Sequence, residues 1–303
     1  MSGIQFKLPM NQKHGCKFVN FQMNHTIQFA ELPKQIKIAY VDQGPSNKPV
    51  LLFIHGLANY LHVWDQNIAT LHKHFRCIAI DLPGNGLSSR QDIEYSINFF
   101  AEVIPVFLMQ LHIKKATLIG HSMGGQIALQ ASLSYPQFVE KLILFAPAGF
   151  EYYSPPEAIL FKSAISFGNF LNMDEVHITQ SITSSFFKPS PVCDKIIQEL
   201  NQIIQQNDRV LYRKMLDYCI NSMLDHQIFN ELKNVHSPTL VFFGENDMLI
   251  PNRFLHPVST KDIASKACKE MKHTQLNIYP NTGHFVQIER SKEVNEQIIA
   301  FLN

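Results

Sequence analysis

The sequence predicts an α/β fold, with a mostly parallel, doubly wound sheet and an inserted set of helices. The first observation is a series of short, nearly continuous apolar runs, which are typical of strands buried on both faces of a parallel sheet. These runs are 50–54, 75–80, 116–119, 141–145 and 239–243, with a last strand at 274–279. The second observation is that helix-like segments separate them, at 59–74, 96–112 and 124–134, with a closing helix at 285–302. Alternation of this kind predicts ligands beyond the carboxyl ends of the strands.

The segments before the first buried run have a different pattern. Residues 26–30 and 35–41 alternate apolar and polar side chains, which predicts an antiparallel hairpin. Residues 1–22 fit no clear pattern, yet they contain enough phenylalanine and leucine to pack onto the fold as an N-terminal arm. The N-terminal residues include no apolar run long enough for a signal peptide.

The third observation is that the alternation stops between residues 148 and 233. Segments 157–170, 191–206 and 208–224 have helical patterns, and prolines punctuate the stretches between them. We interpret 148–233 as a helical cap inserted into one α/β core, which comprises residues 23–147 and 234–303. The cap is expected over the edge of the sheet where ligands bind.

Composition excludes several classes of protein. Hydrophobic residues at 46% and charged residues at 17% describe an ordinary globular core, and a net charge of +1 gives no reason to expect nucleic acid as a partner. No apolar stretch has the length of a membrane span. The 14 histidines show no metal-binding spacing, and the 5 cysteines, an odd number, are typical of reduced thiols in a cytoplasmic protein.

The most informative stretch is 115–130, where a strand pattern runs into Gly-His-Ser-Met-Gly and then into helix formers. Ser122 is the serine of this turn, and small residues at Gly120 and Gly124 allow the backbone to turn sharply. Such a turn holds the hydroxyl clear of the sheet at a helix N-terminus, where partial positive charge favours an oxyanion. Ser122 is therefore the candidate nucleophile.

A serine hydroxyl needs a base to accept its proton, and the base works best when a carboxylate fixes its tautomer. Asp247 follows the strand at 239–243, and His284 follows the strand at 274–279. Both are expected on loops at the edge that carries Ser122, so the three side chains can converge. Their order along the chain is Ser, Asp, His.

From about residue 25 onward the chain resembles the serine-nucleophile α/β-hydrolases. The matching motifs, in order, are His55-Gly56-Leu57, Asp81-Leu-Pro-Gly84-Asn-Gly86-Leu-Ser88, Gly120-His-Ser122-Met-Gly124, Gly244-Glu-Asn-Asp247 and Gly283-His284. One departure is Asn85, where such proteins often carry histidine.

The resemblance implies an oxyanion hole formed by the backbone N–H groups of Leu57 and Met123. It implies hydrolysis of a small-molecule carboxylic ester through an acyl-enzyme, with no cofactor and no metal. In this reading Ser122 attacks, His284 transfers the proton, and Asp247 orients His284.

Other residues near the site are expected to have different roles. His55 and His121 flank the serine and are expected to pack or to bond the backbone. Glu245 and Asp225 are rival acids, although Glu245 lies very close to the end of its strand and Asp225 lies in the predicted cap. Trp64 is expected in the core.

Aromatic residues crowd the predicted cap, and an aromatic lid over a serine nucleophile favours an apolar substrate group. The candidate pocket residues are Phe150, Tyr152, Tyr153 and Phe285.

Two other functions fit the same residues. One is hydrolysis of a carbon–carbon bond with the same triad, although Phe285 stands where such hydrolases usually carry tryptophan. The other is a ligand receptor on a hydrolase fold, with little turnover. Turnover of an ester panel separates these alternatives. The sequence does not specify the oligomeric state.

Overall fold

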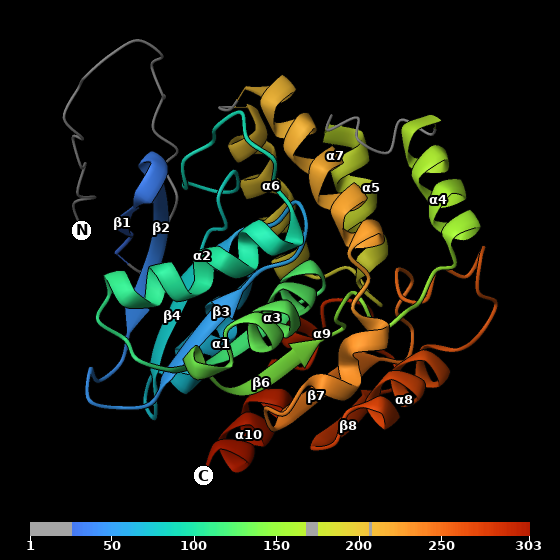
Figure 1. Ribbon diagram of the computed structural model, residues 1–303. Coiled ribbons are helices and arrows are strands. Elements are labelled where there is room, and N and C mark those ends of the chain that lie inside the picture. The colour runs from blue at the N-terminus through green and yellow to red at the C-terminus, as the bar shows by residue number, and fades with distance from the viewer. Residues whose placement is uncertain (1–25, 168–174, 206–207) are drawn as a thin grey trace.

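A single eight-stranded sheet carries the fold (Figure 1). The computed structural model describes residues 26–167, 175–205 and 208–303, so the predicted arm at 1–22 lies outside the described residues. The strands are β1 (Gln28–Leu32), β2 (Ile36–Gln43), β3 (Val50–Ile54), β4 (Arg76–Ile80), β5 (Ala116–His121), β6 (Val139–Phe145), β7 (Thr239–Gly244) and β8 (Thr274–Tyr279). Their order in space is β1-β2-β4-β3-β5-β6-β7-β8.

Strand direction confirms the predicted sheet. Neighbours from β4 through β3 to β8 pair in parallel. The strand β2 is antiparallel to β4 and forms the predicted hairpin with β1. All residues of β3 and β7 are buried, which explains why these strands are continuous apolar runs.

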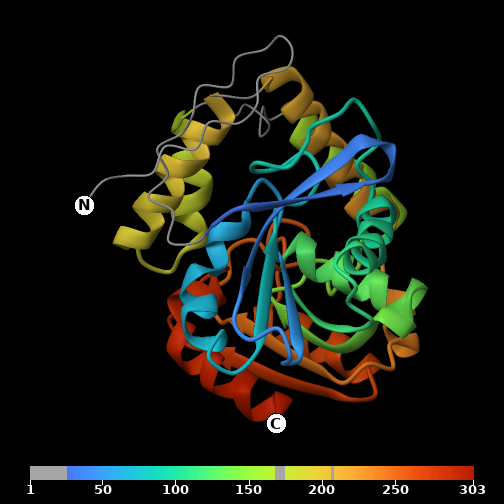
Figure 2. The same cartoon turned by 90° about the vertical axis from the view of Figure 1, so that its left-hand side faces the viewer.

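Helices cover both faces of the sheet, as expected for a doubly wound fold. Figure 2 shows α1 (Asp65–Leu71) and α10 (Ser291–Leu302) on one side and α2 (Ile97–Gln110) and α3 (Met123–Ser134) on the other. The remaining helices of this part are α8 (Thr260–Glu270) and the short α9 (Val286–Glu289).

In the described part of the chain between β6 and β7, four α-helices gather on one side of the molecule (Figure 1). They are α4 (Pro155–Phe167), α5 (Glu175–Ser185), α6 (Pro191–Gln205) and α7 (Arg209–Asp225). Three of them correspond to predicted helices, whereas α5 has no counterpart in the sequence analysis. The residues 168–170 and 206 of the predicted helices lie outside the described part of the chain. We call α4–α7 the helical insertion.

Two predicted helices differ in the structure. The segment predicted as a helix at 59–74 is a 3-10 turn at Leu61–Trp64 followed by the short α1. Leu61 N donates to the Asp81 carboxylate at 2.8 Å, and the backbone just before it is extended, so the helix does not start earlier. The predicted 285–302 helix breaks at Arg290, whose backbone leaves the helical region. The helix α8 was not predicted, although Ser259 and Asp262 form a capping box at its start.

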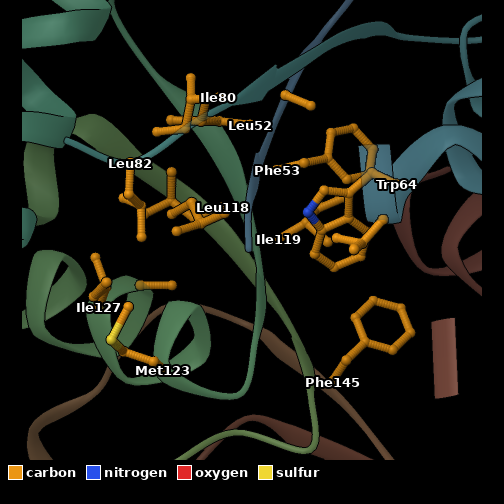
Figure 3. Packing of buried hydrophobic residues seen from close by; sticks show 14 of the residues in the cluster. Leu52, Phe53, Trp64, Ile80, Leu82, Leu118, Ile119, Met123, Ile127 and Phe145 are labelled. Carbon is orange, nitrogen blue, oxygen red and sulfur yellow. The ribbon is translucent and has the colours of Figure 1, made fainter. Parts of the chain in front are cut away.

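The core sits where α3 and the 3-10 turn at Leu61–Trp64 pack on the central strands (Figure 3). Trp64 is fully buried, as predicted, and its ring lies 5.3 Å from that of Phe53 and 5.7 Å from that of Phe145. On the other side of β5, Met123 and Ile127 of α3 point toward Leu118 (Figure 3). These contacts fix the end of β5 relative to the start of α3.

Candidate active site

Ser122 occupies a strained turn between β5 and α3. Its φ of 54° and ψ of −119° lie outside the regions that side chains other than glycine normally adopt. Ser122 N donates to Phe145 O at 2.9 Å, and Ser122 O accepts from Gly125 N at 2.9 Å and from Ala148 N at 3.0 Å. The backbone around the serine is therefore held by both the neighbouring strand and the helix.

The glycines of this turn are required by close backbone approach. A Cβ on Gly120 would lie 2.3 Å from Gly124 O, and a Cβ on Gly124 would lie 2.3 Å from Ile54 O. Neither contact can be relieved by moving a side chain, because the clashing atoms belong to the backbone. The predicted need for small residues at these two positions is confirmed.

His284 and Asp247 form a buried pair. His284 Nδ1 lies 2.8 Å from Asp247 Oδ2, and both residues are at most 3% exposed. The other carboxylate oxygen, Oδ1, accepts from Leu249 N at 2.8 Å and from Ile250 N at 3.0 Å. A carboxylate oxygen in such a bond acts as the acceptor, so the geometry fits the tautomer in which Nδ1 donates and Nε2 keeps a lone pair.

His121, the residue before Ser122, contacts His284 of this pair. The ring of His121 lies 4.7 Å from that of His284, and its Nε2 donates to His284 O at 3.1 Å. Ser122, the next residue, is partly exposed, whereas its neighbours His121 and Met123 are buried. Ser122 is thus partly exposed, and the residue before it contacts the buried histidine–carboxylate pair.

The two residues expected to form the oxyanion hole belong to segments that adjoin Ser122. Leu57 follows β3, and the preceding Gly56 is so close to the serine that an added Cβ would lie 3.1 Å from Ser122 Cβ. Met123 is the first residue of α3, where backbone N–H groups have no partner within the helix. Its side chain is buried and points into the core (Figure 3).

The two flanking histidines are buried and bonded to the backbone. His55 Nδ1 donates to Gly56 O at 2.8 Å, and Nε2 accepts from Leu82 N at 3.0 Å. Burial lowers the pKa of His55 to about 4, so the ring is neutral at pH 7. Burial also lowers the pKa of His121, and the nearby His284 adds to the effect. Both rings therefore shape the site without carrying charge.

The rival acids lie away from His284. Glu245 is exposed. Asp225 lies at the end of α7 and pairs with Lys162 Nζ at 2.5 Å. Among the described residues, Asp247 is the only carboxylate recorded in contact with the His284 ring.

Among the described residues, no aromatic contact joins three of the four predicted pocket residues to the His284 ring. Phe150 is buried, with its ring 6.0 Å from that of Phe243. Tyr152 is 41% exposed. Tyr153 packs in a small separate cluster with Ala158 and Leu224.

Phe285 is the pocket residue that contacts the site. Its ring lies 5.0 Å from that of His121 and stacks on Phe186 of the insertion at 4.7 Å. Both phenylalanines are buried. Phe285 therefore lies between the helical insertion and the histidine beside the serine.

Sequence reasoning missed Glu289 and Ser185, which hold the loop of His284. Ser185 O accepts from His284 N at 2.7 Å, and Glu289 accepts from Gly283 N at 2.8 Å. The only feature of the nearby sequence that could have indicated this support is the acidic residue Glu289, five positions after His284. Its partners are distant in sequence, so no pattern could have identified them.

The described ranges contain no helix long and apolar enough to cross a membrane. In the same ranges, no group of three or more histidine, cysteine, aspartate or glutamate side chains has an arrangement that could hold a metal ion.

Ser122 lies on a strained turn between a strand and a helix, and the histidine–aspartate pair lies at the carboxyl edge of the mostly parallel sheet. This arrangement is typical of a hydrolase of the α/β class. The chain belongs to the alpha/beta hydrolase fold family, which it matches over residues 49–291.

Two relatives and one solved structure show the breadth of this similarity. The chain is 24% identical to an uncharacterized hydrolase of Bacillus subtilis, YugF, over 88% of this chain and 94% of the relative. It is also 24% identical to the human monoacylglycerol lipase ABHD6, over 85% of this chain and 76% of the relative. The crystal structure of a probable hydrolytic enzyme from Pseudomonas aeruginosa superposes with a TM-score of 0.81 at 22% identity, covering 94% of this chain and 96% of that one.

Proposed function

We propose that the protein is a serine hydrolase that cleaves carboxylic esters of small to medium, apolar substrates through an acyl-enzyme. The observation that carries this proposal is the 2.8 Å hydrogen bond between His284 Nδ1 and Asp247 Oδ2 beside the strained Ser122. It leaves Nε2 of the histidine as the only ring atom able to accept the serine proton. Membership of the hydrolase family and similarity to a monoacylglycerol lipase support an ester as substrate.

The proposed reaction begins when Ser122 Oγ attacks the ester carbonyl carbon and His284 Nε2 takes the hydroxyl proton. The backbone N–H groups of Leu57 and Met123 stabilise the negative charge that develops on the carbonyl oxygen. His284 then gives its proton to the leaving alcohol oxygen as the carbon–oxygen bond breaks. Asp247 stays ionised throughout and stabilises the charged imidazolium.

The second half of the reaction releases the acid. Water attacks the acyl-enzyme carbonyl while His284 takes a water proton, and the bond to Ser122 Oγ breaks as that proton passes to the serine. The N–H group of Met123 lies at the N-terminus of α3, so the helix dipole adds to the stabilisation of both tetrahedral oxyanions.

The insertion is proposed to act as a cap that limits the acyl or alcohol group. It lies between β6 and β7, and Phe186 brings an aromatic side chain against Phe285 beside the site. Apolar walls of this kind favour substrates with hydrocarbon chains.

A panel of p-nitrophenyl esters of increasing chain length, with monoacylglycerols alongside, tests the proposal. We expect multiple turnovers in the wild type and none above background in Ser122→Ala. The matched control is Ser134→Ala, an exposed serine at the end of the same helix. A fluorophosphonate probe should label Ser122, and an adduct mapped to another serine would refute the assignment.

If no ester of the panel is hydrolysed, two further results would distinguish the alternative functions. Labelling of Ser122 without turnover of any ester would favour a receptor on the hydrolase fold. Turnover of vinylogous diketones in place of esters would favour carbon–carbon bond hydrolysis. Either result would replace the ester as substrate while leaving the serine as the reactive group.

A further inference from the structure

The helical insertion contacts the backbone of His284 directly. The contact is made by residues 185–187, where α5 ends and the chain turns toward α6. His284 N donates to Ser185 O at 2.7 Å. At Gly283 the two segments are so close that an added Cβ would lie 2.6 Å from Ser185 O and 2.7 Å from Phe187 N. The histidine loop and the insertion therefore touch backbone to backbone.

The carboxylate of Glu289 bridges the same two segments. Its Oε1 accepts from Gly283 N at 2.8 Å, and its Oε2 accepts from Phe187 N at 2.9 Å. Glu289 is half-buried, and this burial raises its pKa, while the two N–H donors act in the opposite direction. Each carboxylate oxygen thus accepts a hydrogen bond from one of the two segments. Neither a shorter side chain nor an amide can accept equally from both N–H groups.

An aromatic stack closes the contact. Phe186 and Phe285 lie with ring centroids 4.7 Å apart and an interplanar angle of 16°. Both side chains are at most 5% exposed. Since Phe186 adjoins Phe187 and Phe285 adjoins His284, the stack reinforces the same junction that the carboxylate bridges. We call Ser185, Phe186, Phe187 and Glu289, with their contacts to residues 283–285, the histidine clamp.

We propose that Glu289 is a positioning residue, which holds the His284 backbone against the helical insertion and so keeps the imidazole aligned with Ser122. The inference rests on the proposed function, since it assigns a support to the proposed base. Displacement of a catalytic group by about 1 Å can cost about 100-fold in rate. The insertion would then support the proton-transfer step, in addition to shaping the substrate site.

Three variants test the clamp. Glu289→Ala leaves two backbone N–H groups without their acceptor, and we expect kcat to fall by about 10- to 100-fold with little change in KM. Glu289→Gln retains one acceptor oxygen and should recover part of the loss. The matched control is Glu293→Gln, which changes a carboxylate of α10 that is 47% exposed and lies 3.5 Å from Arg290. We expect its kcat to equal that of the wild type.

A second readout does not depend on ester turnover. We expect the proton between His284 Nδ1 and Asp247 Oδ2, which lie 2.8 Å apart, to give a downfield resonance that proton NMR can follow. In Glu289→Ala this resonance should broaden or shift, and in Glu293→Gln it should not. If the wild type hydrolyses no ester, the proposed function is wrong, and the NMR resonance still decides whether the clamp orders the histidine.

Rates are referred to the concentration of folded sites, counted by fluorophosphonate labelling at saturation. A normal kcat per labelled site in Glu289→Ala, with an unchanged resonance, would overturn the proposal and leave Glu289 with a structural role only. If Glu289→Ala does not fold, Glu289→Gln and Phe186→Leu take its place. Normal kcat and an unchanged resonance in both of these variants would overturn the proposal equally.

Discussion

His284 Nδ1 lies 2.8 Å from Asp247 Oδ2, although the two residues are 37 positions apart and follow different strands. The strands β7 and β8 are parallel neighbours, so the loops after them leave the same edge of the sheet side by side. The carboxylate is fully buried and receives two further N–H bonds from its own loop. It is therefore a rigid acceptor for the imidazole proton.

Replacing that carboxylate should abolish most activity without unfolding the protein. In Asp247→Asn the amide can present its NH2 group to Nδ1 and favour the wrong imidazole tautomer, so we expect kcat to fall by about four orders of magnitude. Ester hydrolysis and circular dichroism measure the two effects. The matched control is Glu245→Gln, because Glu245 is an exposed acid two residues away. A larger loss in the control would move the role to Glu245.

The strained elbow should not tolerate an added methyl group. Gly120→Ala places a Cβ 2.3 Å from Gly124 O, and relief of that clash must move either β5 or α3. We expect destabilisation of about 3 kcal/mol or more, together with loss of fluorophosphonate labelling at Ser122. Urea unfolding and intact-mass labelling test this. A stable, fully labelled variant would show that the turn is less constrained than its geometry implies.

The free energy of unfolding should depend on pH through Asp81, whose carboxylate accepts from Leu61 N and Leu87 N at 2.8 Å each. Burial raises the pKa of Asp81 from 3.8 to about 6. The folded state therefore binds the proton more tightly than the unfolded state, so this contribution is largest below pH 4 and is lost as pH rises to about 6. The shift corresponds to about 3 kcal/mol.

Urea unfolding at several pH values can isolate that contribution. The stability difference between the wild type and Asp81→Asn should change by about 2 kcal/mol in favour of the variant as pH rises from 4 to 7. Asp92→Asn is the control, because Asp92 is 61% exposed and pairs with Lys214 at the surface. A difference that stays constant with pH would show that Asp81 titrates normally.

Ester preference should depend on chain length. Each methylene buried in an apolar site contributes about 0.8 kcal/mol, which raises kcat/KM by about fourfold until the site is full. We expect a maximum between butyrate and octanoate, shifted by Phe150→Ala if that side chain limits the site. Phe29→Ala, on the edge strand β1, is the control. An optimum at acetate that neither Phe150→Ala nor Tyr152→Ala alters would exclude these residues from specificity.

The sequence by itself predicted the sheet, the order of its strands along the chain and the candidates Ser122, Asp247 and His284. These predictions were possible because the relevant signals are local. A buried parallel strand must be apolar along its length, and a nucleophile elbow must place glycines beside its serine. The resemblance to a known family added the oxyanion residues Leu57 and Met123.

Only the tertiary structure decided which distant segments meet. The N–H group of Leu61 donates to the carboxylate of Asp81, which lies 20 residues later in the chain. No periodicity in the sequence indicates that contact. Likewise, Glu289 lies beside Phe187 although the two are 102 residues apart. The sequence could not predict these pairs, because a backbone N–H group can donate to any carboxylate that the fold brings within reach. Which carboxylate arrives is set by how the loops and helices pack around the sheet.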